Sequence, residues 1–234
     1  MNYIILNGVK SNKIQGLMIQ ALPSVSKPQM RSQIETIDGR DGDIVTKLGY
    51  AAYDKQLLIG LHGDYNIDEV IKYFNSNGTV IFSNENDKYY NYQILESIDF
   101  ERLLRFKQAV VTFHVQPFKY SVSEGKPEFQ IMNGSEVKIN NNGNIFSKPV
   151  ITLNGSGSCG IYLNGSQIFS ISFGNSDDNI TINTEEMEAY SGSILRNRIV
   201  TGNYDNFYLP IGVNRIAFTG DCSYFSIKNY SRWI

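Results

Sequence analysis

The chain has 234 residues, 41% of them hydrophobic and 19% charged, which is enough for one large or two small cores. Its 21 Lys and Arg residues nearly balance 23 Asp and Glu residues, and the formal net charge is -2. Nucleic-acid binding is not expected, because no basic excess can release counterions from a polyanion. The sequence has no long apolar run, so we expect no membrane span. Its N-terminal residues lack the basic and apolar regions of a signal peptide, so we expect no secretion signal.

The chain has two cysteines, Cys159 and Cys222. Two are too few for a disulfide framework or for a zinc site with four cysteine ligands. We expect two small buried thiols, and a single bridge between them stays open. No metal ion and no cofactor is expected.

The composition of the chain changes near residue 130. Residues 1–130 hold 14 of the 21 Lys and Arg residues, whereas residues 131–234 are crowded with Asn, Ser and Gly. The segment 121–127 between them contains a Gly and a Pro and has no periodicity, which suits a connection. The sequence therefore predicts two domains, residues 1–130 and residues 131–234.

Short alternating or apolar runs predict β-strands along the first domain, with one helix among them. The helix is indicated by Ile67, Val70, Ile71 and Phe74, which are spaced as one helical face, and by Asn66 as a plausible N-cap. The strands of this domain are predicted at residues 3–6, 57–61, 79–82, 90–95 and 109–115.

The second domain shows strand patterns with turn residues between them and no helical pattern. Two packed sheets are the usual way for such a series to bury its alternating faces, so we expect a β-sandwich. Its strands are predicted at residues 150–153, 161–163, 168–173, 180–182, 198–200, 215–218 and 224–228. The fold class is thus mainly β.

Residues 11–39 form a long segment with few core-like runs, and they include Pro23 and Pro28. This pattern favours an arm that embraces a neighbouring subunit over a series of packed strands. Open sheets also expose edge strands, which a neighbour in a cyclic oligomer can cover.

The glycines of Gly155-Ser-Gly-Ser-Cys-Gly160 match a dinucleotide-binding spacing. That function needs a helix directly after the glycines, whereas residues 161–165 predict a short strand and a turn. We therefore interpret the motif as a hairpin.

The acidic run Asp38-Gly-Arg-Asp-Gly-Asp43 raises the hypothesis of a calcium site. Val45, Thr46 and Ala52 stand where an EF-hand loop starting at Asp41 needs oxygen ligands or a glycine. An EF-hand is excluded, an irregular metal site stays open, and a glycine-rich turn whose charges pair with another surface is favoured.

Catalytic patterns are weak. The two histidines are His62 and His114, and His114 falls on the strand face opposite its apolar neighbours, so a nucleophilic triad is not expected. Glu185, Glu186 and Glu188 supply carboxylates that glycoside hydrolysis would need, but an acidic surface loop is the simpler interpretation. We expect a protein that is not an enzyme.

Aromatic residues make up 12% of the chain, and tyrosines beyond the needs of a core favour contact surfaces. A clustered set raises this hypothesis of a contact surface in the first domain. The set is Tyr50, Tyr53, Tyr89, Tyr90 and Tyr92.

The order of several pieces resembles the distal tail protein (Dit) family of long-tailed phages (siphophages) of Gram-positive bacteria. The pieces of the first half are Asn7-Gly8, Ile37 to Gly42, Asn77-Gly78, Val80 to Phe82 and Val111 to Tyr120. Those of the second half are Asn142-Gly143, Ser147 to Pro149, Leu209 to Ile216 and Ser231 to Ile234.

This resemblance implies a structural protein of the virion tail tip, made in the cytoplasm of the bacterial host. It implies a homo-hexameric ring of N-terminal β-sandwich-like domains with one helix, and C-terminal galectin-like β-sandwich domains. The implied partners are the major tail tube protein, the tail-associated tip protein and receptor-binding proteins of a baseplate.

The resemblance also implies roles for single residues. The subunit interface would include Gly39, Arg40, Asp41, Gly42 and Tyr50, and the domain junction would include Pro117 and Phe118. The alternative function is a carbohydrate-binding module for host recognition, with Trp233 as the saccharide contact.

Overall fold

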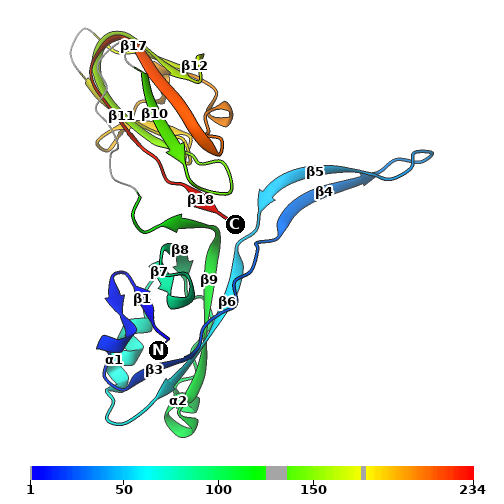
Figure 1. Ribbon diagram of the computed structural model, residues 1–234, viewed down its shortest axis with the longest axis vertical. Helices are drawn as coiled ribbons and strands as arrows, with labels where there is room; N and C mark the ends of the chain where they lie inside the picture. The colour runs from blue at the N-terminus through cyan, green and yellow to red at the C-terminus, as the bar shows by residue number, and fades with distance from the viewer. Residues whose placement is uncertain (1, 125–135, 175–177) are drawn as a thin grey trace. The chain divides into compact units, whose positions relative to one another are not determined.

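The computed structural model describes residues 2–124, 136–174 and 178–234. It is mainly β, as predicted, and it divides into unit 1, residues 1–122 with residue 234, and unit 2, residues 123–233 (Figure 1). The predicted boundary at residue 130 lies outside the described residues and stays a prediction.

Unit 1 is built on an antiparallel sheet with the strand order β2-β1-β7-β8-β9-β6-β3. The central strands alternate in burial, because Leu57 and Ile59 of β6 and Val111 and Phe113 of β9 all face the core. The strands are β1 (Ile4–Leu6), β2 (Val9–Lys10), β3 (Leu17–Ala21), β6 (Tyr53–Leu61), β7 (Gly78–Phe82), β8 (Lys88–Gln93) and β9 (Gln108–Ser121).

Helix α1 (Ile67–Phe74) lies where the sequence predicts it. The Asn66 side chain accepts hydrogen bonds from the first-turn amides of Asp68 and Glu69, at 3.1 and 3.4 Å. One detail differs from the prediction, because Ile71 is exposed and Tyr73 is buried instead. The Tyr73 hydroxyl donates to the Val9 carbonyl at 3.0 Å, which allows this polar ring inside the unit.

A second helix, α2 (Phe100–Phe106), is present, so the expectation of one helix is wrong. The Asp99 carboxylate caps it by accepting from the Arg102 amide at 2.8 Å, and Lys107 ends it in a left-handed conformation. Leu103 is its buried residue. Phe100 also packs against the core, but a helix of 7 residues is too short to give the sustained periodic pattern by which a sequence predicts a helix.

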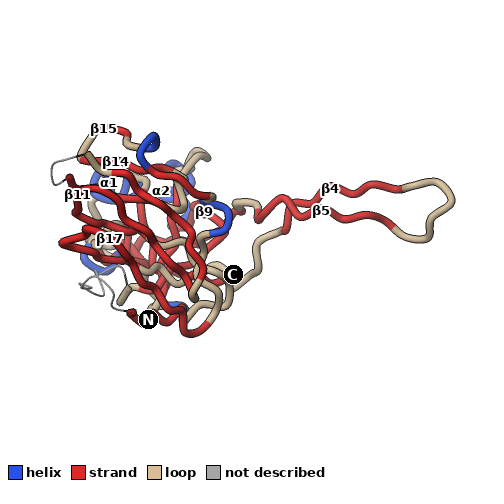
Figure 2. Tube along the Cα trace, turned by 90° about the horizontal axis from the view of Figure 1, so that it is seen from above, coloured by secondary structure: helices blue, strands red, loops and turns tan. Residues whose placement is uncertain are grey.

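Strands β4 (Met30–Thr36) and β5 (Asp43–Tyr50) form a separate two-stranded sheet that extends away from the rest of unit 1 (Figures 1 and 2). We call residues 30–50 the arm. The predicted arm at residues 11–39 is therefore partly wrong, because β3 inside that segment pairs with β6 and buries Leu17 and Ile19 in the core.

Unit 2 is a second antiparallel sheet system with the order β10-β17-β11-β13-β14-β15, in which β12 pairs with β11 and β16. One edge of β11 pairs with β17 along its length, and the other pairs first with β13 and then with β12. The strands of this sheet are β10 (Glu136–Asn141), β11 (Val150–Leu163), β12 (Ser166–Ser172), β13 (Asp178–Asn183), β14 (Glu188–Ser191), β15 (Ile194–Leu195), β16 (Val200–Gly202) and β17 (Gly212–Lys228). The short strand β18 (Arg232–Trp233) is not part of this sheet.

Two pairs of predicted strands are single long strands in unit 2. Residues 150–153 and 161–163 both belong to β11, and residues 215–218 and 224–228 both belong to β17. The glycine motif at residues 155–160 lies inside β11, where the register with β17 shifts. The hairpin interpretation is wrong, because these residues form a bulge that bends the strand instead of reversing it. No helix follows the glycines.

Candidate subunit interface

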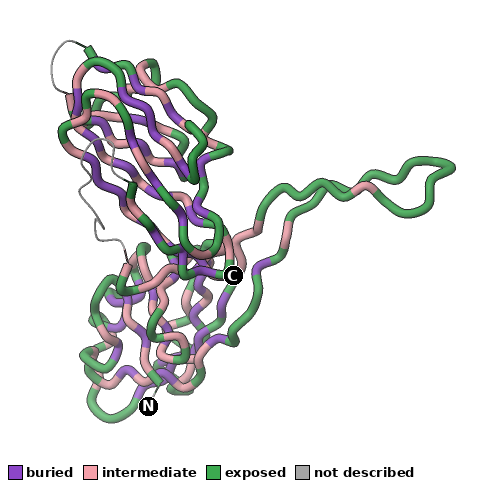
Figure 3. The backbone as a smooth tube through the Cα atoms, turned by 45° about the horizontal axis from the view of Figure 1, so that its top comes forward, coloured by how far each residue is buried: buried purple, intermediate pink, exposed green. Residues whose placement is uncertain are grey.

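The arm exposes large apolar side chains. Ile34 of β4 lies directly opposite Val45 of β5, and they are 60% and 57% exposed. Ile37 and Leu48 are also about half exposed, and Figure 3 shows the arm as exposed along nearly all of its length. Several exposed apolar residues on one hairpin are typical of a surface that another molecule covers.

The tip of the arm carries four of the predicted interface residues, Gly39, Arg40, Asp41 and Gly42. The two glycines have φ angles of +82° and +76°, which the turn requires and which other residues rarely adopt. The Arg40 amide donates to the Ile37 carbonyl at 3.1 Å and closes the turn. The charges of Arg40 and Asp41 therefore stand at the exposed end of the arm (Figure 2).

The fifth predicted interface residue, Tyr50, lies at the opposite end of the arm, at its base. Its ring meets the ring of Phe118 edge to face, with centroids 5.7 Å apart. The Ala51 amide also donates to the Gln29 carbonyl at 2.8 Å. This bond extends the pairing of the two arm strands by one residue beyond Met30 and Tyr50. The structure therefore separates Tyr50 from the tip and groups it with Phe118.

A buried lysine lies beside the base of the arm. Lys55 of β6 is 3% exposed, and its ammonium donates to the Ser24 carbonyl at 2.8 Å. Burial lowers the pKa of Lys55, and the negative charge of Glu85 opposes only part of that effect. The hydrogen bond holds the segment before the arm against the sheet.

Glu85 completes this buried charged cluster. Lys119 donates to one of its carboxylate oxygens at 2.8 Å, and the Tyr90 hydroxyl donates to the other at 2.7 Å. Burial acts to raise the pKa of Glu85, but these hydrogen bonds and the charges of Lys119 and Lys55 outweigh it and hold the pKa below its usual value.

Sequence reasoning missed this cluster, although one signal was present. Lys55 stands two residues before Leu57 and four before Ile59, so it shares the inward face of β6. A charged residue at a core position needs partners, and for Lys55 these are the Ser24 carbonyl and the negative charge of Glu85, which also pairs with Lys119 of β9.

The five tyrosines predicted as a contact surface divide between core and surface. Tyr90 and Tyr92 are 0% and 3% exposed, so the hypothesis is wrong for these two, which lie on the inward face of β8. Tyr50, Tyr53 and Tyr89 are half-buried.

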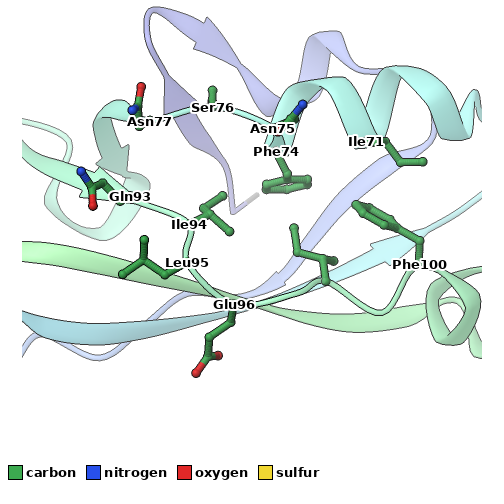
Figure 4. Close-up of a pocket in the computed structure, with 11 residues that line it drawn as sticks. Ile71, Phe74, Asn75, Ser76, Asn77, Gln93, Ile94, Leu95, Glu96 and Phe100 are labelled. Carbon is green, nitrogen blue, oxygen red and sulfur yellow. The ribbon is translucent and has the colours of Figure 1, made fainter.

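A groove of about 810 Å³ lies between the end of α1 and the segment that leads from β8 to α2 (Figure 4). Phe74 and Ile94 form part of its apolar wall, and Leu95 at its edge is 66% exposed. Asn77 and Gln93 line the polar end. Sequence analysis did not identify this groove, because its two walls are distant in the chain.

The weak catalytic candidates have structural partners. His114 faces away from the core, as predicted, and its Nδ1 lies 2.8 Å from an Asp54 carboxylate oxygen. In unit 2, Arg232 donates to Glu185 at 2.8 Å, and the Asn183 side chain accepts from the amides that follow it. Glu185 thus takes part in a loop contact within unit 2.

Within the three described ranges, no three His, Cys, Asp or Glu side chains come close enough together to hold a metal ion. None of the helices in those ranges has the length and apolar character needed to cross a membrane.

The remaining predicted site residues lie near the ends of the units. Pro117 and Phe118 stand in β9, which continues to Ser121, and the chain passes from unit 1 to unit 2 after Val122. Trp233 is half-buried in β18. The junction role and the saccharide contact stay predictions.

Comparison with known proteins identifies structural relatives over the whole chain. No protein-family profile and no curated protein sequence matches it. The crystal structure of the Dit protein (gp19.1) of phage SPP1 matches with a TM-score of 0.66 and 14% identity, over 100% of both chains. The chain has the Dit fold.

Chains of the phage P2 baseplate, in its activated conformation with Ca and with Sr, show the same fold. Their TM-scores are 0.50 and 0.52 and their identities 11% and 12%, and each match covers 98% of this chain and 97% of the other. The Dit fold thus includes both units, which agrees with the family resemblance seen in the sequence.

Proposed function

We propose that this protein is a distal tail protein, a structural hub at the tail tip of a siphophage that infects Gram-positive bacteria. The observation that carries the proposal is the full-length match to SPP1 Dit, which is described as a paradigm of the hub adsorption apparatus of such phages. The hub would join the tail tube to the tip protein and to receptor-binding proteins. It would act by assembly and not by catalysis.

The proposed assembly is a ring of six copies, and the arm supplies its physical rationale. A hairpin of two strands is marginally stable by itself in water, and this one leaves Ile34 and Val45 uncovered. A neighbouring copy in a closed ring would cover these side chains on every subunit alike. A specific contact needs about 800 Å² from each partner.

The proposed subunit contacts involve both ends of the arm. Gly39, Arg40, Asp41 and Gly42 would bring one positive and one negative charge to a neighbour, which favours a fixed register over simple attraction. Tyr50 would contact the neighbour at the base, where its ring is half-buried. The formal net charge of -2 keeps repulsion among six copies small.

The proposal is tested by imaging and by mass. Purified full-length protein is measured across a range of concentrations by light scattering, and virion tails are examined by electron microscopy. We expect a six-fold ring of the N-terminal units in the tails. Tails that lack six-fold density of this size would contradict the proposal.

A charge variant tests the role of the tip. Arg40→Glu reverses the positive charge of the tip, and we expect it to weaken assembly while thermal stability stays the same. Arg198→Glu, an exposed arginine of unit 2, is the matched control and should assemble as the unaltered protein does. If both variants assemble equally well, Arg40 does not contribute to the interface.

A further inference from the structure

The two cysteines of the chain come together in unit 2. Cys159 lies on β11 and is 1% exposed, and Cys222 lies on β17 and is half-buried. Both are free thiols, and Cys222 packs against the core cluster to which Cys159 belongs. The two side chains therefore face the same side of the strand pair.

The register places the cysteines diagonally across two neighbouring antiparallel strands. Cys159 pairs with Gly220, and Cys222, two residues further along β17, pairs with Gly155. Residues at such diagonal positions are neighbours on one face of a sheet. The register shifts between these two pairs, so the backbone at this point is a bulge and not a rigid ladder.

The glycine opposite each cysteine permits a close approach of the strands. A Cβ atom on Gly220 would lie 1.9 Å from the Ser158 carbonyl oxygen and 3.0 Å from Cys159 Cα. A Cβ atom on Gly155 would lie 3.3 Å from Cys222 Cα. Larger residues at either glycine would force the strands, and with them the two sulfur atoms, apart.

The two thiols are also chemically unequal. The neighbouring Cys159 thiol lowers the pKa of Cys222. The same contact, together with burial, raises the pKa of Cys159. A thiolate is the reactive form of cysteine. The more exposed Cys222 is therefore the attacking cysteine, and the buried Cys159 is the resolving cysteine.

We propose that Cys159 and Cys222 form a reversible disulfide bond that joins β11 to β17 when the protein meets a mild thiol oxidant. With glutathione disulfide, the Cys222 thiolate attacks one sulfur and releases a glutathione thiolate. Cys159 then gives up its proton and attacks the Cys222 sulfur, which releases the second glutathione. Two cysteine thiols become one disulfide, and the oxidant takes up two electrons and two protons as two glutathione thiols.

The bond would join the two longest strands of unit 2. Strands β12 to β16 lie between Cys159 and Cys222 in the chain, so the bond would close a long loop and restrict the unfolded chain. A cysteine pair of this kind stays reduced in the cytoplasm, and its disulfide bond forms in an oxidising medium outside the cell. That setting rests on the proposed function, whereas the thiol chemistry does not depend on it.

The test compares the full-length protein in its reduced and oxidised states. Protein treated with glutathione disulfide is denatured, its free thiols are alkylated, and its intact mass and peptides are measured. We expect no alkylated cysteine, a peptide linked through Cys159 and Cys222, and a thermal midpoint of unit 2 higher by about 5 °C. A reducing agent should reverse all three changes.

Three results would overturn the inference. They are a stable glutathione adduct on Cys222 with Cys159 still alkylated, a disulfide between two copies of the chain, and the absence of any reaction. The Cys222→Ser variant is the control and should show no redox-dependent shift in its thermal midpoint. The comparison of redox states in the unaltered protein needs no variant to fold, and a failed ring assay leaves this result unaffected.

Discussion

The Tyr50 ring meets the Phe118 ring edge to face, with centroids 5.7 Å apart and planes inclined by 75°. Tyr50 is the last residue of β5, and Phe118 belongs to β9. The contact therefore links the base of the exposed arm to the long strand that leads out of unit 1. This contact and the Lys55 hydrogen bond to the Ser24 carbonyl both hold the chain at the base of the arm against the sheet.

A double-mutant cycle on Tyr50 and Phe118 tests this anchor. Edge-to-face aromatic pairs contribute about 0.5 to 1.5 kcal/mol beyond their buried area, so we expect a coupling energy in that range between Tyr50→Ala and Phe118→Ala. Denaturant unfolding of unit 1 measures it. A control cycle of Tyr50 with Phe106, an exposed residue of α2, should give additive effects. If the effects of Tyr50→Ala and Phe118→Ala are also additive, the ring contact does not stabilise the base of the arm.

The apolar pair of the arm should matter for assembly and not for folding. Ile34→Ser with Val45→Ser removes two exposed side chains, so the free energy of unfolding of unit 1 should change by less than about 0.5 kcal/mol for each substitution. Assembly of the proposed ring should be lost, as measured by light scattering. Val213→Ser removes an equally exposed apolar residue from unit 2 and should leave assembly intact. Normal rings from the arm variant would contradict its proposed role.

The Glu85 cluster should make unit 1 sensitive to acid. The folded protein holds the pKa of Glu85 below its unfolded value of about 4.3, so the charged cluster stabilises the fold above that pH. The stabilisation is lost as the pH falls through 4.3 and further through the lower folded pKa. Thermal midpoints measured between pH 7 and pH 3 should show this loss.

Two variants separate the effect of Glu85 from general acid denaturation. Glu85→Gln leaves Lys119 and Lys55 without their buried counter-charge and should cost about 2 to 4 kcal/mol at pH 7. Its difference from the unaltered protein should shrink below pH 4. Glu96→Gln, at an exposed carboxylate, should cost less than about 0.5 kcal/mol at every pH. A constant difference for Glu85→Gln would exclude Glu85 as the source of the pH dependence.

The bulge between β11 and β17 should not tolerate a side chain at Gly220. Gly220→Ala combines a φ of +98° with a Cβ atom 1.9 Å from the Ser158 carbonyl oxygen, so unit 2 should lose about 3 kcal/mol. Gly165→Ala has a similar φ of +88° and open space, and it should cost about 1 kcal/mol. Calorimetry of the full-length chain measures both. Equal costs would show that backbone conformation alone matters and that the strands can move apart.

Local patterns were sufficient where neighbouring residues decide the structure. Helix α1 follows from the spacing of Ile67, Val70 and Phe74 and from the Asn66 cap, which all act within a few residues. The central strands β6 and β9 follow from alternation, and the turn at the tip follows from its glycines. The mainly β class and the resemblance to the Dit family needed no more than these local features and their order.

Long-range contacts decided the rest. The apolar residues of residues 30–50 are scattered and stay exposed, and the segment forms an arm because β4 and β5 pair with each other. The breaks in the patterns of β11 and β17 are typical of turns, but the pairing between these two strands converts them into a bulge.

The sequence by itself determined the fold class, helix α1 and the family resemblance, because these depend on residues that are close in the chain. Tertiary structure alone decided that Lys55 shares a buried cluster with Glu85, that Tyr50 contacts Phe118, and that the two cysteines lie diagonally across β11 and β17. Each of these contacts joins residues far apart in the chain. Such partners are selected by the packing of whole strands, which no local pattern records.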